Sequence, residues 1–308
     1  MVIFLLNALR AAVFHRLRPM TAIKLEFLWY NRRLPRLDPP VTFNEKIAYR
    51  KLYDRDPRLP RLADKVHVKE QIARLLGEQW VIPTLWTGDR LPPREERNWP
   101  IPYVLKANHG SGWNLFVRAK EDEDWDRIEK MTERWLRSTY GRVTKEWLYS
   151  EIKPRLLVEP FVSDDGEMPP DYKLFVFCGR TAMVQVDLGR MGNHRQYFYD
   201  AKWNRLKFTY VWPYEKDDIL PPRSLDKLLW AASRLGDPFS FARIDFYEVR
   251  GEPLFGEFTF YPSGGRFPFN PESIELELGR LWPMAGQSGM EQEKPGEKRG
   301  IGGLLSLR

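Results

Sequence analysis

Residues 239–262, FSFARIDFYEVRGEPLFGEFTFYP, decide the fold of this chain because they read as two strands joined by a tight turn. Side chains alternate between the two faces of a strand, so a symmetric hairpin places Asp245 opposite Glu257 and Arg243 opposite Thr259. Directly opposed residues have β-carbons about 5 Å apart. Two carboxylates this close repel each other and need a compensating cation. A hard divalent ion such as Mg²⁺, completed by substrate phosphates, is suited to this role.

The same stretch carries two further expectations and one alternative. The turn is expected at residues 250–252, with the pairing centred on Gly251. The two-residue period predicts that Phe255 shares a strand face with Glu257. The alternative to a metal site is an ordinary hairpin whose acidic residues face water or pair with Arg243.

Composition bounds the class of protein and its partners. The 308 residues carry a formal net charge of +7 and give a pI of about 9.3, which favours an anionic partner: nucleotide, nucleic acid, acidic glycan or membrane surface. The single cysteine, Cys178, excludes an intramolecular disulfide and favours a reducing cytoplasm. The four histidines lie far apart, so the chain has no zinc-site spacing. Aromatic residues make up 14% of the chain, and aromatic packing is favoured over a stacking surface as the cause.

The two ends of the chain have distinct sequence patterns. Residues 1–17 have the pattern of an amphipathic helix that is too short and too interrupted to cross a bilayer. Packing of its apolar face on the protein is favoured, and peripheral contact with a membrane at the inner face stays open as the alternative. Residues 285–308 are rich in Gly, Gln, Glu and Lys and are expected to form a flexible tail.

Two helices are predicted in the first third of the chain. Thr42 and Glu45 have capping-box spacing, so a helix is expected to continue to about residue 52. A second helix begins near Asp64 and stops at Gly77. Three basic side chains of this helix are more simply explained as a solvated face than as substrate contacts: Lys65, Lys69 and Arg74.

A Gly-rich loop in residues 103–117, YVLKANHGSGWNLFV, is the next candidate for a binding site. The preceding strand ends at Lys106, and glycines let backbone amides approach phosphate oxygens. This is no P-loop, because no Gly-Lys-Ser/Thr follows, and a plain hairpin turn is the competing interpretation. Residues 125–140 form a helix whose apolar stripe belongs to the core.

Further polar residues come from the middle of the chain. A strand ends at Glu159, and the hairpin that follows presents Asp171 and Lys173 on one strand, with Gln185 and Asp187 on its return strand. A basic loop comes next and is either a contact for an acidic substrate or plain surface. Its members are Arg190, Asn193, His194 and Arg195.

These pieces together resemble the ATP-grasp superfamily, and more closely its branch similar to the teichuronopeptide biosynthesis protein TupA. The resemblance rests on ordered motifs over about 240 residues: TFNEKIAYRKLYDRDP, LADKVHVKEQI, VLKANHGSGWN, VEPFV, DYKLFVF, VQVD with R-x-x-NHR, ARIDFY and GEFTFYPSGG. It implies an α+β ATP-grasp fold, in which two α+β subdomains with antiparallel sheets clasp the nucleotide. A mainly helical region at residues 1–100 would precede the ATP-grasp domain at 101–284, and the tail at 285–308 would follow it.

The resemblance also implies roles for individual residues. Lys106 and Arg243 would contact phosphates, Lys173 would lie beside the nucleotide, and Arg190 would join Lys106 and Arg243 in catalysis. The phosphate loop would comprise His109, Gly110, Ser111, Gly112 and Trp113, and the strand that meets adenine and ribose would comprise Glu159, Pro160, Phe161 and Val162. Magnesium would be held by Asp245, Glu257 and Thr259, and substrate by Arg190, Asn193, His194 and Arg195.

Two positions depart from the superfamily pattern. Thr259 stands where an asparagine is common at the metal strand, and Pro160 stands where a second acidic residue is common and removes a backbone donor.

The function that the resemblance implies is an ATP- and Mg²⁺-dependent carboxylate-amine ligase that works through an acyl phosphate. Its substrates would be an acid and an amine or hydroxyl acceptor belonging to a cell-surface polysaccharide or its precursor, with no nucleic-acid partner. Three alternatives stay open. They are a sugar kinase, a glycosyltransferase of polysaccharide synthesis, and a non-enzymatic binder of acidic polymer.

Overall fold

The computed structural model describes residues 16–163, 166–189 and 192–284. The predicted helix over residues 1–17 lies almost wholly outside these ranges, and the predicted tail lies entirely outside them. The described chain forms two compact units, and each unit is assembled from two stretches. Unit 1 comprises residues 1–23 and 51–163, and unit 2 comprises residues 24–50 and 164–308. This division by compactness differs in kind from the predicted division at residues 100 and 284, which stays a prediction.

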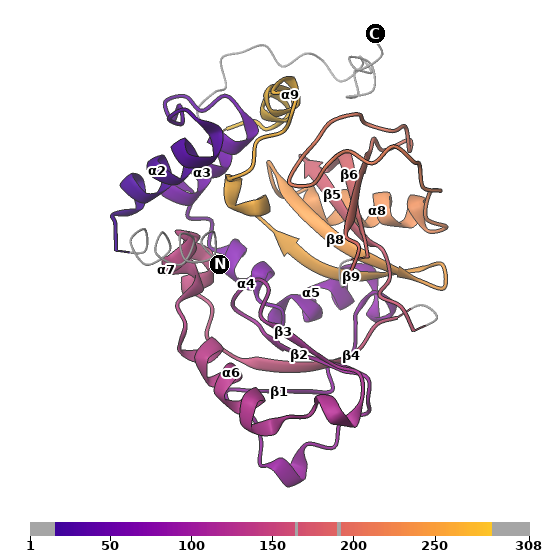
Figure 1. Ribbon diagram of the computed structural model, residues 1–308. Helices are drawn as coiled ribbons and strands as arrows, with labels where there is room; N and C mark the ends of the chain where they lie inside the picture. Colours follow the sequence, from indigo (N-terminus) through magenta and orange to yellow (C-terminus); the bar gives the residue numbers. More distant parts are fainter. Residues whose placement is uncertain (1–15, 164–165, 190–191, 285–308) are drawn as a thin grey trace. The chain divides into compact units, whose positions relative to one another are not determined.

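Unit 1 is built on a four-stranded antiparallel sheet in the order β1-β4-β2-β3 (Figure 1). Its strands are β1 (Trp86–Gly88), β2 (Tyr103–Ala107), β3 (Asn114–Val117) and β4 (Leu156–Pro160). Its α-helices are α4 (Arg58–Ala63), α5 (His67–Leu76), α6 (Trp125–Arg137) and α7 (Tyr140–Thr144), with short 3₁₀ turns η1 (Glu78–Trp80), η2 (Arg94–Glu96), η3 (Lys120–Asp122) and η4 (Trp147–Ser150). Ile128 and Trp135 of α6 are buried in the core with Leu105 and Val158, as the apolar stripe predicts.

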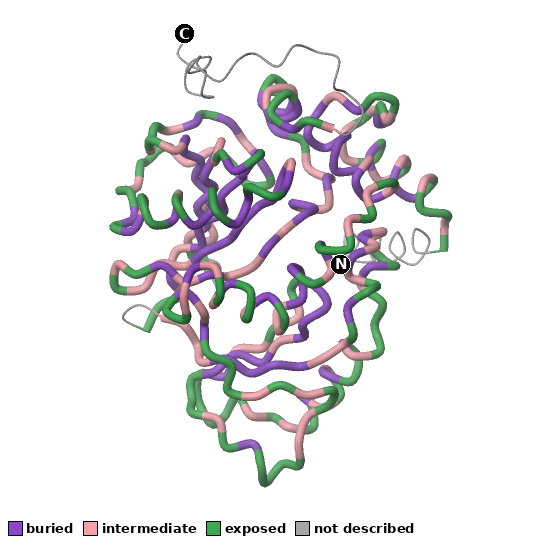
Figure 2. The backbone as a smooth tube through the Cα atoms, turned by 180° about the vertical axis from the view of Figure 1, so that it is seen from behind, coloured by how far each residue is buried: buried purple, intermediate pink, exposed green. Residues whose placement is uncertain are grey.

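Unit 2 is built on a five-stranded antiparallel sheet in the order β7-β6-β5-β8-β9. Its strands are β5 (Asp171–Phe177), β6 (Arg180–Leu188), β7 (Arg195–Tyr199), β8 (Ala242–Val249) and β9 (Glu252–Thr259). Its other elements include α8 (Leu225–Gly236), η5 (Pro262–Gly265) and α9 (Ser273–Leu281), and the chain runs into it through α2 (Pro19–Asn31) and α3 (Phe43–Tyr53). The inner strands β2, β4 and β5 are almost wholly buried, whereas β1 and β3 are mostly half-buried or exposed (Figure 2). The mixture of helices with antiparallel sheets confirms the predicted α+β fold class.

One face of the unit 2 sheet is apolar and is covered by α8, which packs against β5, β6 and β8 (Figure 1). The approach is so close that a β-carbon on Gly236 would lie 2.4 Å from Cγ1 of Val176. Val176, Leu174 and Tyr172 alternate with Phe175, Lys173 and Asp171 along β5. Lys173 and Asp171 therefore lie on the face that α8 leaves free, and this polar face carries most of the predicted site residues of unit 2.

The helix α3 begins at the predicted capping box. Glu45 accepts a hydrogen bond from the backbone N–H of Thr42 at 3.0 Å, and the backbone N–H of Glu45 donates to Oγ1 of Thr42 at 3.4 Å. Within unit 2 the helix inserts Phe43 edge-on against Phe241, with ring centroids 5.0 Å apart. Arg50 lies over the ring of Trp282 at 4.3 Å. Such contacts confirm that aromatic packing accounts for much of the aromatic content.

The hairpin that opens the sequence analysis forms β8 and β9, with Asp245 opposite Glu257 and Arg243 opposite Thr259. Its turn is shorter than predicted. Only residues 250 and 251 turn, and both have positive φ, as a type I′ turn requires. A two-residue turn alone would shift the predicted pairing by one residue, but the register shifts back between Asp245 and the next residue of β8.

The shift is a β-bulge at Gly256, and it corrects one expectation about the faces of β9. Gly256 has no partner in the ladder, and a β-carbon there would lie 3.1 Å from the carbonyl oxygen of Asp245. Phe255 pairs with Phe246 instead of sharing the face of Glu257, and the two rings lie 6.1 Å apart. The expectation that Phe255 and Glu257 lie on one face was wrong, because the extra residue reverses the alternation between them.

Candidate active site

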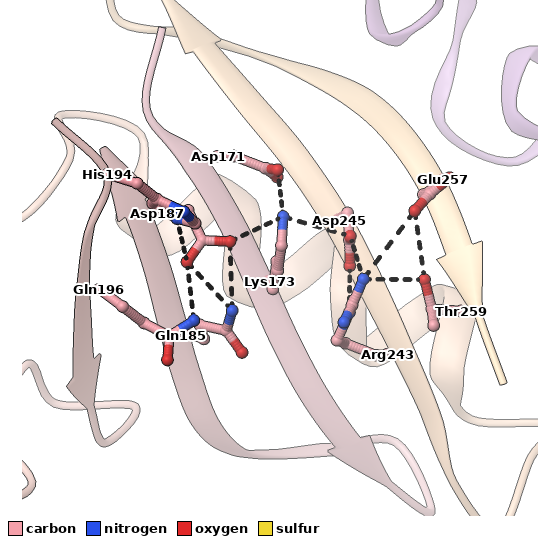
Figure 3. A network of polar contacts seen from close by, with 10 residues as sticks. All are labelled: Asp171, Lys173, Gln185, Asp187, His194, Gln196, Arg243, Asp245, Glu257 and Thr259. Carbon is pink, nitrogen blue, oxygen red and sulfur yellow. Dashed lines mark hydrogen bonds and ion pairs between the residues drawn. The ribbon is translucent and has the colours of Figure 1, made fainter. Parts of the chain in front are cut away.

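The polar face of unit 2 brings the two acidic residues of the hairpin together with Arg243 (Figure 3). The Arg243 guanidinium donates from Nε to Oδ1 of Asp245 at 2.8 Å and from Nη2 to Oδ2 at 2.6 Å. Its Nη2 also donates to Oγ1 of Thr259 at 3.0 Å and lies 3.9 Å from Oε1 of Glu257. Burial alone would lower the pKa of Arg243, but Asp245 outweighs it and raises the pKa, so the guanidinium stays charged.

The donor atoms of this pair fit a hard cation. Asp245, Glu257 and Thr259 offer only oxygen, which Mg²⁺ prefers. In the described ranges no group of three or more His, Cys, Asp or Glu side chains is placed to hold a metal, so phosphates and water would have to complete an octahedron. Arg243 now holds both oxygens of Asp245, as in the salt-bridge alternative. Binding of a metal would require Asp245 to exchange this partner.

Lys173 continues the polar face on the neighbouring strand, directly opposite Asp245. Its ammonium donates to Asp171 and lies 3.4 Å from Asp187 and 3.5 Å from Asp245. Burial acts to lower the pKa of Lys173, but these three carboxylates outweigh it and raise the pKa. Lys173 is therefore a fixed positive charge that links the hairpin to the next strands of the sheet.

Asp187 forms a second polar cluster on β6 and β7. It accepts hydrogen bonds from Nε2 of Gln185 at 3.1 Å and from Nε2 of Gln196 at 3.0 Å. His194 places Nε2 at 3.4 Å from Oδ1 of Asp187, and its ring packs against Trp212 at a tilt of 57°, with centroids 4.8 Å apart. Burial acts to raise the pKa of Asp187, but Lys173 and these hydrogen bonds lower it, so the carboxylate stays ionised.

The predicted basic loop is only partly brought to this cluster. Arg190 lies outside the described residues. Asn193 is exposed. Arg195 pairs with Asp217 at 3.3 Å. His194 is thus the loop residue that the structure brings to the polar face, within the part of the loop that it describes.

In unit 1 the predicted Lys106 and Glu159 meet on neighbouring strands of the sheet, where Nζ of Lys106 donates to Oε2 of Glu159 at 2.5 Å. Lys69 of α5 pairs with Oε1 of the same carboxylate and donates to the carbonyl of Ile82 at 2.8 Å. Burial acts to raise the pKa of Glu159, but the two lysines outweigh it and lower the pKa. Two cations on one buried carboxylate leave an excess of positive charge, which suits an anionic ligand.

The Gly-rich loop of unit 1 is anchored by Asn108 and not by its glycines. Asn108 is fully buried, donates to Oδ1 of Asp64 at 3.0 Å, and accepts from the backbone N–H of Arg155 at 2.7 Å. The ring of His109 is buried, with Nδ1 3.1 Å from Asn108 and Nε2 3.1 Å from the carbonyl of Trp135. Burial lowers the pKa of His109, so the neutral ring is favoured. Both ring nitrogens are used inside unit 1, so a contact of this loop with phosphate would come from its backbone.

Three more residues of the loop have defined surroundings. Trp113 packs edge-on against the ring of His109 at 5.0 Å. A β-carbon on Gly110 would lie 2.8 Å from the Trp113 ring, and Gly112 has a φ of +75°, so both positions require glycine. Ser111 is exposed between them. Lys65 donates to the carbonyl of Gly110 at 2.6 Å and so ties α5 to the loop.

The strand that is predicted to meet adenine and ribose ends as the sequence suggests. β4 ends at Pro160, which pairs with Tyr103, and the backbone N–H of Phe161 donates to the carbonyl of Pro102 at 3.0 Å. The ring of Phe161 packs edge-on against Phe116 at 5.8 Å. Val162 follows and is half-buried.

Several polar residues of these clusters were not singled out from the sequence. Lys65 and Lys69 were assigned to a solvated helix face, and only Arg74 has that position, where it pairs with Glu70 on the surface. The buried carboxylate that draws Lys69 inward is 90 residues away in the sequence, so helical periodicity gave no signal. Gln196 was also missed, because one glutamine on an aromatic strand resembles an ordinary surface residue.

The sequence matches the family model TupA-like ATPgrasp over residues 45–282. No curated protein matches it. Solved structures with a similar fold include the ATP-grasp ligase PsnB complexed with a minimal precursor, at 12% identity and a TM-score of 0.41 over 73% of this chain and 62% of that one. The D-alanine–D-alanine ligase from Bacillus anthracis matches at 13% identity and a TM-score of 0.42 over 79% of this chain and 69% of that one. The L-amino acid ligase from Bacillus licheniformis matches at 12% identity and 0.43 over 80% of this chain and 55% of that one. The chain thus spans 55–69% of the length of these structures.

Within residues 16–163, 166–189 and 192–284, no helix has both the length and the apolar character that a membrane span needs.

Proposed function

Because the chain belongs to the TupA-like ATP-grasp family, we propose that it is an ATP-dependent ligase that joins a carboxylate to an amine or hydroxyl through an acyl phosphate. A cell-surface polysaccharide or its precursor is the proposed acceptor class. The observation that carries the proposal is the direct opposition of Asp245 and Glu257 beside Arg243 on one polar face. Mg²⁺, when bound there, would supply positive charge to the phosphates.

The residues of the two units divide the work by charge. In unit 1, Lys106 and Lys69 are proposed to neutralise nucleotide phosphates, with Glu159 fixing both ammonium groups in the absence of nucleotide. In unit 2, Arg243 is proposed to turn from Asp245 to the γ-phosphate when Asp245 takes up a metal. Phosphoryl transfer asks the protein mainly for positioning and charge neutralisation, and these groups supply both.

The proposed chemistry has two steps. A substrate carboxylate oxygen forms a bond to the γ-phosphorus while the bond to ADP breaks, which gives an acyl phosphate. The amine nitrogen or hydroxyl oxygen then forms a bond to the acyl carbon, inorganic phosphate leaves with the electron pair, and the nucleophile loses one proton. Lys106 and Arg243 are proposed to hold the charge that develops on phosphate oxygens.

The test is product analysis with panels of acids and amines. A ligase gives ADP and free phosphate only when both an acid and an acceptor are present, and hydroxylamine should trap the acyl phosphate as a hydroxamate when the acid alone is supplied. A phosphorylated sugar would indicate a kinase, turnover of a nucleotide sugar without ATP would indicate a glycosyltransferase, and binding without turnover would indicate a polymer-binding protein. Each of these three results would overturn the proposal.

A further inference from the structure

Two buried amide oxygens on the polar face of unit 2 have no hydrogen-bond donor among the residues that the structure describes. They are Oε1 of Gln185 on β6 and Oε1 of Gln196 on β7, and the two residues are only 4% and 5% exposed. A buried acceptor without a donor costs about 1–3 kcal/mol. Two such atoms on adjacent strands therefore call for an explanation that the predicted ATP and metal residues do not give.

Asp187 fixes which way both amides point. Nε2 of Gln185 donates to Asp187 at 3.1 and 3.2 Å, and Nε2 of Gln196 donates to it at 3.0 Å. An amide that turns its nitrogen to a carboxylate must turn its oxygen away, and Figure 3 shows both oxygens on the side of Asp187 that is turned away from Asp171. The carboxylate also polarises the two amides, which makes their oxygens better acceptors.

The charge around the amides selects the ligand. Asp171 and Asp187 share the ammonium of Lys173, and the ring of His194, 3.4 Å from Asp187, adds positive charge only when it is protonated. With His194 neutral, these groups carry an excess of one negative charge. The amide nitrogens already donate to Asp187, so they are not available to an anionic ligand. A cationic donor fits both observations, and a primary ammonium carries three N–H groups, two of which match the two oxygens.

We propose that Gln185 and Gln196, oriented by Asp187, form a subsite for a protonated primary amine. This inference rests on the proposed ligase function in one respect, since the bound ammonium, after releasing one proton to water, would be the amine that attacks the acyl phosphate. The location agrees with that role. Gln185 lies opposite Lys173, and Lys173 lies opposite Asp245, so the Gln185 amide is two strands, about 10 Å, from Asp245. Gln196 lies one strand further from Asp245, on β7.

The test is a ligand-observed NMR titration of the full chain with propylammonium chloride, compared with 1-propanol as the hydroxyl probe of equal size. Propylammonium should bind at least tenfold more tightly than propanol. Gln185→Met and Gln196→Met keep side-chain length but remove the acceptor, so each should weaken propylammonium binding about tenfold, or about 1.4 kcal/mol. Gln71→Met on the exposed side of α5 is the matched control and should change nothing.

A conservative variant separates an acceptor role from a structural one. Gln185→Glu keeps oxygen acceptors and adds a carboxyl group beside Asp187, so it should bind propylammonium at least as tightly as the wild type does. Thermal unfolding shows whether Gln185→Met folds. If it does not fold, the inference is tested with Gln185→Glu and with Gln196→Met, which lies on the edge strand β7. Equal binding of the two probes, no binding of propylammonium, or unchanged affinity in the Met variants would overturn the inference and leave water as the donor to both oxygens.

Calorimetric titration with Mg·ATP separates this inference from the ligase proposal. ATP affinity should be the same in the wild type and in Gln185→Met and Gln196→Met. Propylammonium binding without any ATP turnover would overturn the ligase proposal alone. Turnover with acid and amine that is insensitive to both Met variants would overturn the subsite alone.

Discussion

The two units carry polar clusters with opposite excess charge. In unit 1, Lys69 and Lys106 share the single carboxylate of Glu159. In unit 2, ion pairs among the described residues join four carboxylates to the permanent cations Lys173 and Arg243 and to the imidazole of His194: Asp171, Asp187, Asp245 and Glu257. A surplus of ammonium groups suits phosphate oxygens, and a surplus of carboxylates suits a metal ion or an ammonium group. The difference indicates that the polar cluster of unit 1 favours anionic ligands and that the polar cluster of unit 2 favours cationic ligands.

The largest expected effect comes from removing carboxylate charge in unit 2. Glu257→Gln should lower ATP turnover about 10³-fold, because a ligand charge is lost with little change in shape. Phosphate release with Mg·ATP, acid and amine measures this effect. Asp245→Asn should lower turnover equally, and it should also lower the melting temperature because Arg243 loses a buried partner.

The matched control for these variants lies on the same hairpin. Glu252 pairs with Lys227 at the exposed end of β9, at 2.7 Å, so Glu252→Gln should leave turnover unchanged. Near-normal ATP turnover in Glu257→Gln would contradict the proposal that the carboxylates of unit 2 bind a metal.

The acid-rich unit should also be the pH-sensitive one. Burial raises the pKa of Glu275 in α9 to about 7, and hydrogen bonds from Phe269 and other groups offset this only in part. Between pH 4.5 and 7 the unfolded chain has released this proton while the folded chain retains it, so the free energy of unfolding should fall as pH rises through this window, by at most about 3 kcal/mol.

Denaturant unfolding at pH 5 and pH 7.5 measures this loss. Glu275→Gln mimics the protonated carboxyl and should lose much less stability between the two pH values than the wild type does. An identical pH dependence in both proteins would show that burial does not raise the pKa of Glu275.

A smaller effect is expected from Lys69, and it tests the positively charged cluster of unit 1. Lys69→Met should raise the Kd for ATP about tenfold, because one of the two ammonium groups at Glu159 is lost. Arg74→Met, on the same helix but paired with Glu70 at the surface, is the control and should leave the Kd unchanged. Isothermal titration with ATP distinguishes them, and equal Kd values for both variants would return Lys69 to the solvated face that helical periodicity predicts.

The smallest effect is expected from the β-bulge at Gly256, which brings Asp245 opposite Glu257. Gly256→Ala places a β-carbon 3.1 Å from the carbonyl of Asp245, which should cost about 1 kcal/mol of stability. Thermal unfolding reports this cost, with Gly192→Ala as a control because a β-carbon at Gly192 meets nothing within 4 Å. A melting temperature equal to that of the wild type would mean that the bulge adapts without strain.

Short-range patterns predicted much of this molecule, and long-range partners were harder to predict. The capping box at Thr42 and the core stripe of α6 follow from neighbours three or four residues apart, and both predictions were confirmed. The opposition of Asp245 and Glu257 was also predicted correctly, although the reasoning placed the extra residue in the turn and not at Gly256. The burial of Lys69 depends on a strand from a distant part of the chain, which no local pattern encodes.

The Gly256 bulge has a consequence for the tolerance of this hairpin to insertions. A hairpin with a two-residue turn and one bulged residue pairs Asp245 with Glu257. A hairpin with a three-residue turn and no bulge would give the same pairing. The two solutions are interchangeable as far as the acidic pair is concerned. A chimaera that lengthens the tip by one residue and deletes Gly256 should preserve the alignment, so the exposed end of the hairpin is free to be remodelled without disturbing the chemistry beneath it.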